Sequence, residues 1–129
     1  MKLLLDTHVF IWADAEPEKL SPNVAGLIKD TDNQLFLSVV SVWEMQIKVQ
    51  LGKLTLRTDL DTLIGEQEAN NGLELLPVVL PHVLALGKLP ALHKDPFDRL
   101  LVAQTLQEGF ALLSHDKLVQ QYPIPVVWN

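Results

Sequence analysis

The stretch LLLDTH at residues 3–8 joins three consecutive leucines to an acid, a threonine and a histidine. A short apolar run of this kind is typical of a strand that is buried on both faces, and Asp6 marks its end. The same order recurs along the chain, because Leu35 to Val40 precedes Glu44 and Phe110 to Leu113 precedes Asp116. If these runs are parallel strands, their carboxyl ends share one edge of the sheet, where open α/β sheets bind ligands.

Two further acids, Asp95 and Asp98, follow the apolar run Pro90 to Leu92. Acids that are distant in sequence would then meet in space. Several carboxylates that lie close together cannot all stay ionised unless a cation compensates their charge, and oxygen ligands select Mg²⁺ or Mn²⁺. The pattern therefore predicts a divalent-metal site at this edge of the sheet.

Apolar runs alternate with longer segments of helical spacing along the whole chain, which predicts an α/β fold with a parallel sheet. Strands are expected at residues 3–5, 35–40, 73–79, 110–113 and 126–128. A helix is expected to start near residue 7, and further helices are expected near residues 21–29, 41–52, 58–71, 81–87 and 95–109. The helix at 41–52 is predicted from the capping box formed by Ser41 and Glu44.

The composition fits one domain that spans residues 1–129, since 48% of the residues are hydrophobic. The chain contains no cysteine, which excludes disulfides, zinc–thiolate sites and thiol catalysis and agrees with a reducing cytoplasm. The apolar start is shorter than the roughly 7–15 residues of a secretory segment. Prolines and charges interrupt residues 73–92, so the roughly 20 apolar residues of a membrane span are lacking. We therefore expect a soluble, cytoplasmic protein.

The net charge of −6 argues at first against a nucleic-acid partner, because phosphate binding depends largely on Lys and Arg. However, five of the 16 acids are those singled out above. Bound divalent cations would neutralise much of the excess negative charge. The net charge alone therefore excludes no partner.

Capping is a simpler explanation for each acid taken alone. Acids at or just inside expected helix starts are Asp6, Asp95, Asp98 and Asp116. Glu44 fits the capping box with Ser41, and it also precedes Lys48 by four residues, which is the spacing of a stabilising ion pair. Capping accounts for them one by one, whereas their recurrence after successive runs favours a shared site. Capping and metal binding are compatible, because a carboxylate that caps a helix with one oxygen can offer its second oxygen to a metal ion.

Three histidines lie within two residues of an acid: His8, His93 and His115. They are candidate outer-shell partners or proton carriers, although histidine is also common at half-exposed loop positions. Lys48, Arg99 and Lys117 are the basic residues nearest the acids and candidates for contact with substrate phosphate, although any charged helix face would look similar. The three tryptophans are assigned to the core or an interface, because one indole alone does not predict base stacking.

Taken together, the motifs resemble those of PIN-domain ribonucleases, particularly the VapC-type toxins of type II toxin–antitoxin pairs. The matching segments are LLLDTH at 3–8, SVWEMQIKVQLGKL at 41–54, HKDPFDRLLVAQ at 93–104 and LLSHD at 112–116. The resemblance covers essentially the whole chain, and the order and spacing of the segments make it specific. It implies a PIN-like fold, with a central parallel sheet of about five strands flanked by helices on both faces.

The resemblance also implies which residues form the site. Asp6, Glu44, Asp98 and Asp116 would be the catalytic and metal-binding quartet, with Asp95 an additional nearby carboxylate. The implied activity is Mg²⁺- or Mn²⁺-dependent cleavage of RNA by a chain that is frequently a homodimer and is inhibited by a small protein antitoxin. Many relatives carry a hydroxyl where this chain has His8, so Thr7 is a candidate replacement for that group.

Two alternatives stay open from the residues alone. Metal-independent RNA cleavage would use His8 and His115 as general base and acid through the substrate 2′-hydroxyl. A PIN-like module could also bind RNA or a protein partner without cutting it. Survival of activity in EDTA separates the histidine mechanism from the metal mechanism.

Overall fold

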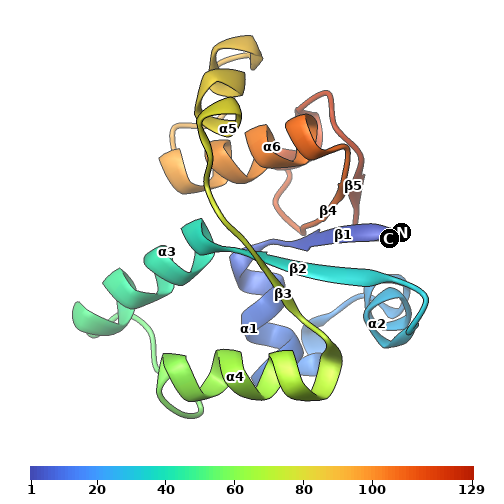
Figure 1. Ribbon diagram of the computed structural model, residues 1–129, viewed down its shortest axis with the longest axis vertical. Helices are drawn as coiled ribbons and strands as arrows, with labels where there is room; N and C mark the ends of the chain where they lie inside the picture. The colour runs from blue at the N-terminus through green and yellow to red at the C-terminus, as the bar shows by residue number, and fades with distance from the viewer.

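A five-stranded parallel sheet forms the centre of the computed structural model, which describes residues 1–129 (Figure 1). The strands are β1 (Lys2–Leu5), β2 (Gln34–Ser38), β3 (Glu74–Leu76), β4 (Ala111–Leu113) and β5 (Val126–Val127). Their order across the sheet is β3-β2-β1-β4-β5, and every neighbouring pair is parallel. The carboxyl ends of β2, β1 and β4 therefore lie next to one another, as the sequence predicted.

Helices cover both faces of this sheet, which confirms the expected α/β architecture. They are α1 (Thr7–Ala15), α2 (Pro22–Lys29), α3 (Val39–Gln50), α4 (Leu60–Asn71), α5 (Leu80–Ala85) and α6 (Pro96–Glu108), with 3-10 turns at Pro17–Lys19, Leu86–Lys88 and Val119–Gln121. Figure 1 shows α1, α2 and α4 on one side of the sheet and α5 and α6 on the other. None of these helices combines the length and apolar character that a bilayer crossing requires.

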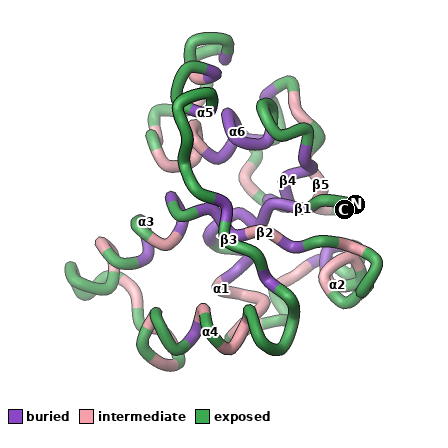
Figure 2. The backbone as a smooth tube through the Cα atoms, in the orientation of Figure 1, coloured by how far each residue is buried: buried purple, intermediate pink, exposed green.

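The leucine run of β1 supplies both halves of the core. Leu3 and Leu5 pack with the α1, α2 and α4 side, whereas Leu4 packs with α6. All three leucines are at most 3% exposed. Figure 2 shows the buried residues concentrated in the sheet and on the inner sides of the helices. Because both faces of β1 are covered, the strand is continuously apolar and not alternating.

The predicted boundary between the second strand and its helix is wrong by a few residues. The helix begins at Val39, because the Ser38 hydroxyl accepts a hydrogen bond from the Val40 N–H at 3.1 Å and caps it. Ser41 therefore lies inside α3, and the predicted capping box with Glu44 does not form. The third strand also stops early, at Leu76, because Pro77 has no N–H to continue the ladder.

Candidate functional site

Asp6 directly follows β1 and is 6% exposed. It occupies the N-cap position of α1, but its side chain makes no capping hydrogen bond. Its Oδ2 accepts a hydrogen bond from Ser114 Oγ at 2.6 Å, across 108 positions of sequence. Burial raises the pKa of Asp6, and the hydrogen bond from Ser114 opposes that rise. Capping therefore does not explain Asp6.

Asp98 lies in the first turn of α6, and Asp95 prepares its position. The Asp95 Oδ1 caps α6 by accepting hydrogen bonds from the N–H groups of Phe97 at 2.8 Å and Asp98 at 3.2 Å. Burial, followed by the charges of Asp6, Asp95 and Glu44, raises the pKa of Asp98 to about 7. The acid after β1, the acid on α3 and the acid that caps α6 therefore all act on one carboxyl group, which is the crowding that the sequence predicted.

Asp116 uses its two oxygens differently. Its Oδ1 accepts hydrogen bonds from the N–H groups of Leu118 at 2.8 Å and Val119 at 3.3 Å, so it caps the following turn. Its Oδ2 lies 3.1 Å from His93 Nε2 and faces the other acids. Burial raises the pKa of Asp116, but the hydrogen bonds from His93 and the two amides outweigh it and lower the pKa. Capping thus positions this carboxylate and leaves its second oxygen in the site.

His93 joins two of the acids, although the sequence placed it only among several histidines near acids. Its Nε2 lies 3.1 Å from both Asp98 Oδ2 and Asp116 Oδ2. Its Nδ1 accepts the Asp95 N–H at 3.2 Å, so in the neutral ring Nε2 carries the proton. The available signal was the spacing H-x-D-x-x-D, which places His93 just before the α6 cap.

His93, Asp98 and Asp116 form a group whose ligand-type atoms lie within 4.8 Å of one another. Asp6 and Glu44 stay outside that group, although their charges reach Asp98. The carboxylate oxygens of Asp98 and Asp116 are the donors open to an ion and suit hard divalent cations such as Mg²⁺ and Mn²⁺, whereas the Nε2–H of His93 holds the two acids together. A cation there would also compensate the repulsion that raises the pKa of Asp98, so the residues fit such an ion.

Glu44 is 4% exposed and has a partner at each oxygen. Its Oε1 accepts a hydrogen bond from Thr7 Oγ1 at 2.8 Å, and its Oε2 pairs with Lys48 Nζ at 2.9 Å. Thr7 Oγ1 also lies 2.8 Å from Ser41 Oγ. The hydrogen bond with Glu44, helped by the charges of the neighbouring acids, raises the pKa of Lys48. The predicted pair between Glu44 and Lys48 is confirmed, and Thr7 is directed at Glu44.

The remaining accessory candidates divide into two groups. His8 and His115 line a cavity of about 270 Å³ together with Asp6, Trp12 and Asp116. Arg99 instead donates hydrogen bonds to the carbonyl oxygens of Pro90 at 2.9 Å and Leu86 at 3.4 Å. Its guanidinium therefore holds the segment that precedes His93.

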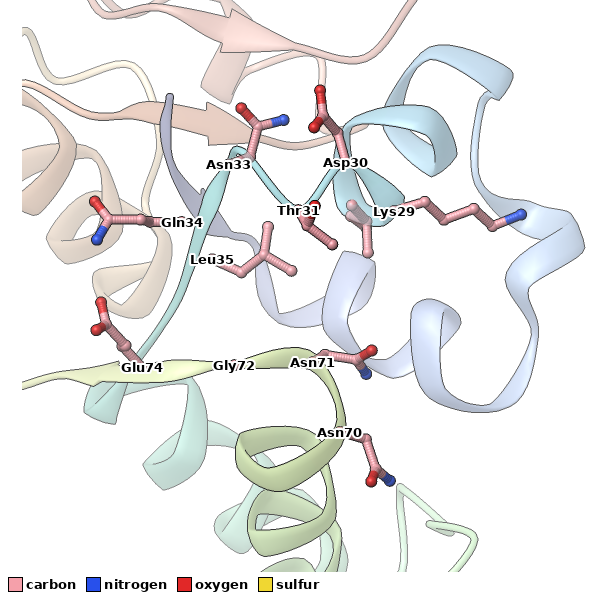
Figure 3. A pocket seen from close by; sticks show the side chains of 11 residues that line it. Lys29, Asp30, Thr31, Asn33, Gln34, Leu35, Asn70, Asn71, Gly72 and Glu74 are labelled. Atoms are coloured by element: carbon pink, nitrogen blue, oxygen red, sulfur yellow. The ribbon is translucent and has the colours of Figure 1, made fainter.

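A separate cavity of about 480 Å³ lies at the opposite edge of the sheet (Figure 3). Asp30, Asn33, Asn71 and Glu74 are among its lining residues, near the amino ends of β2 and β3. Asp30 and Glu74 belong to no cluster of three metal-binding groups. The one cluster of three metal-binding groups in the structure therefore lies at the carboxyl edge and not beside this cavity.

Comparison with known proteins agrees with this arrangement. The family model described as PIN domain matches residues 3–124. Ribonuclease VapC22 of Mycobacterium tuberculosis (strain ATCC 25618 / H37Rv) is 28% identical over 130 residues, which cover 98% of each chain.

Two solved structures share the fold at low sequence identity. VapBC2 from Rickettsia felis, bound to a DNA fragment from its promoter, has a TM-score of 0.72 and 17% identity over 100% of both chains. DNA-bound VapBC from Salmonella typhimurium has a TM-score of 0.68 and 13% identity, covering 98% of this chain and 97% of that one.

Proposed function

Because the chain belongs to the PIN-domain family, we propose that it is a divalent-metal-dependent endoribonuclease and the toxin of a type II toxin–antitoxin pair. The observation that carries the proposal is the gathering of Asp6, Glu44, Asp95 and Asp98 at one edge of the sheet, where burial and then the charges of the other three acids raise the pKa of Asp98 to about 7. A site that crowds carboxylates in this way is suited to a cation. The ribonuclease named among the relatives supports RNA as the substrate.

Asp6, Asp98 and Asp116 are the proposed ligands of Mg²⁺ or Mn²⁺, and His93 holds the last two together. When bound, the ion orients the phosphate, lowers the pKa of a water molecule and stabilises the leaving oxygen. Glu44 is fixed by Thr7 and Lys48, so we assign it to orienting the attacking water. Lys48 offsets part of the negative charge and can approach the substrate phosphate.

The test is cleavage of RNA by the purified protein with Mn²⁺ or Mg²⁺. Activity should be lost in EDTA and should fall by orders of magnitude in Asp98→Asn or Asp6→Asn, which keep the side-chain size but remove the charge. Asp61→Asn, at an exposed position on α4, is the matched control and should keep wild-type activity. Wild-type rates in Asp98→Asn would refute the assignment.

The chemical ends of the cleavage products distinguish metal-dependent hydrolysis from the remaining enzymatic alternative. Cleavage that survives EDTA and leaves cyclic phosphate ends would instead indicate His8 and His115 acting through the 2′-hydroxyl. Absence of any cleavage under all metal conditions would support a module that only binds RNA or a partner.

We extend the proposal to the partners of the protein. Residues 1–129 act as one PIN-like domain in the cytoplasm, as a homodimer that a small protein antitoxin inhibits. The similar solved structures are of VapBC assemblies, which supports a protein partner. An exposed apolar face on α5, formed by Leu80, Val83 and Leu84, supports self-association.

A further inference from the structure

Four aromatic rings gather beside the acids from three separate parts of the chain. His8 and Trp12 stand four residues apart on α1, so they share one face of the helix, and their ring centroids are 5.9 Å apart. His115, after β4, lies 6.2 Å from Trp12. Trp128, after β5, lies 6.0 Å from Trp12 and 4.7 Å from His115. The fold thus builds an aromatic cluster that no single segment of sequence indicates.

The cavity of about 270 Å³ described above opens on this cluster. Its lining combines the rings of His8, Trp12 and His115 with the carboxylates of Asp6 and Asp116. The volume lies just below the roughly 300–1,000 Å³ of sites that enclose a whole small ligand. The space therefore suits one flat ring system next to the proposed metal ligands.

We propose that this cavity is a nucleobase subsite, in which an unpaired base of the substrate packs against the rings of His8, Trp12 and His115. The inference rests on the proposed nuclease function and deepens it. A base that stacks on these rings would be attached to a phosphate near Asp6 and Asp116, where cleavage is proposed. Bases inside a duplex are already stacked, so the substrate must present a single-stranded segment or loop at this point.

The surroundings of the cluster favour a nucleotide. Both imidazoles are exposed, whereas rings that served only as core would be buried. Lys19 Nζ, which also pairs with Glu16, lies 6.0 Å from the centroid of the Trp12 ring and places a basic group at the edge of the cluster. Aromatic side chains next to a basic group are the usual elements of single-strand recognition, and every base offers a ring face for stacking.

Trp43 provides an internal control, because it is exposed but lines no such cavity. It is 60% exposed, and its ring packs edge-on against Phe97 at 5.1 Å between centroids. Replacement of Trp43 removes an exposed indole of the same size that does not line the cavity. The change in KM that this replacement causes is the effect of losing an exposed indole that does not line the cavity.

The first experiment is a titration of the metal-free protein with adenosine, followed by NMR. Adenosine carries a base but no phosphate, so neither metal binding nor cleavage enters the measurement. Millimolar adenosine should shift the indole N–H signal of Trp12 and the imidazole C–H signals of His8 and His115, and should leave Trp43 unmoved. Absence of these shifts, or shifts at Trp43 instead, would overturn the proposal.

The second experiment compares cleavage of a single-stranded RNA oligonucleotide by three variants. Trp12→Leu should raise KM about tenfold at nearly unchanged kcat, which corresponds to ~1.4 kcal/mol. Trp12→Phe keeps a ring and should restore most of the loss, while Trp43→Leu should leave KM within about twofold of wild type. Calorimetric Mn²⁺ affinity should be equal in all of them, which shows that the acids are intact. If Trp12→Leu does not fold, His8→Ala replaces it, because His8 is exposed.

The outcomes separate this inference from the proposed function. Adenosine shifts at the cluster without any RNA cleavage by the wild-type protein would support the subsite and refute the nuclease. Metal-dependent cleavage with an unchanged KM in Trp12→Leu and His8→Ala would support the nuclease and overturn the subsite.

Discussion

Asp98 is the residue whose ionisation is most directly linked to stability. Its pKa is about 7 in the folded protein, against 3.8 for the ordinary side chain. Between these two values the folded state binds more protons than the unfolded state, so stability should fall as pH rises from about 4 to about 7 and then level off. Because the group is partly solvated, we expect a contribution on the order of 1–2 kcal/mol.

The measurement is urea unfolding in EDTA at several pH values. Asp98→Asn cannot ionise, so the difference in unfolding free energy between the variant and the wild type should grow in favour of the variant from pH 4 to pH 7. Mn²⁺ should stabilise the wild type most above pH 7, where it no longer competes with a proton. A pH-independent difference would show that folding does not raise the pKa of Asp98.

His93 should influence the metal through the two carboxylates that it joins. We expect His93→Ala to weaken Mn²⁺ binding about tenfold, because Asp98 and Asp116 lose the Nε2–H group that lies 3.1 Å from each of them. Isothermal calorimetry measures the affinity directly. Unchanged affinity would mean that backbone capping alone fixes both acids.

At the scale of elements, two aspartates allow capping to be separated from function. Asp95 caps α6 beside the acids, and Asp59 caps α4 by accepting the Thr62 N–H at 2.9 Å. Asp95→Ala and Asp59→Ala should each reduce the unfolding free energy by about 1 kcal/mol. RNA cleavage should fall only in Asp95→Ala, because that cap also aims Asp98. Equal loss of activity in both variants would contradict this division.

Elements that depend on local chemistry could be predicted from the sequence. Asp95 before Pro96 was expected to cap a helix and does so, and Gly109 ends the same helix with a φ of 69°. The error at α3 arose because two serines compete as caps. Ser38, at the end of a buried strand, is the N-cap in the structure. Ser41 has the stronger sequence signal, because it and Glu44 have the spacing of a capping box. The packing of the strand and the helix in the folded protein decides which of the two serines caps α3.

Contacts between distant segments could not be predicted in the same way. The strand-end rule brought Asp6 and Asp116 to one edge, but it gave no reason to select His93 or Ser114. These two depend on the exact approach of β1, β4 and the α6 cap. The aromatic cluster is similar, because Trp12 and Trp128 meet only after the sheet has formed.

At the scale of the whole molecule, the apolar face of α5 predicts self-association. Leu80 and Leu84 are 68% and 64% exposed, which is unusual for neighbouring leucines on one short helix. We expect a homodimer in solution and conversion to a monomer by Leu84→Lys, measured by light scattering after gel filtration. Leu51→Lys, at a position that is 62% exposed at the end of α3, is the control and should stay dimeric. A wild-type monomer would refute this surface as a dimer interface.

The pairing of β1 with β4 also determines when the protein can become active during synthesis. Leu3 aligns with Ala111, and the hydrogen bond from Ser114 to Asp6 spans 108 positions. A nascent chain that is still attached to the ribosome before β4 emerges therefore has Asp6 but lacks the neighbour strand that completes the site. The proposed site can therefore form only after nearly the whole chain has been synthesised.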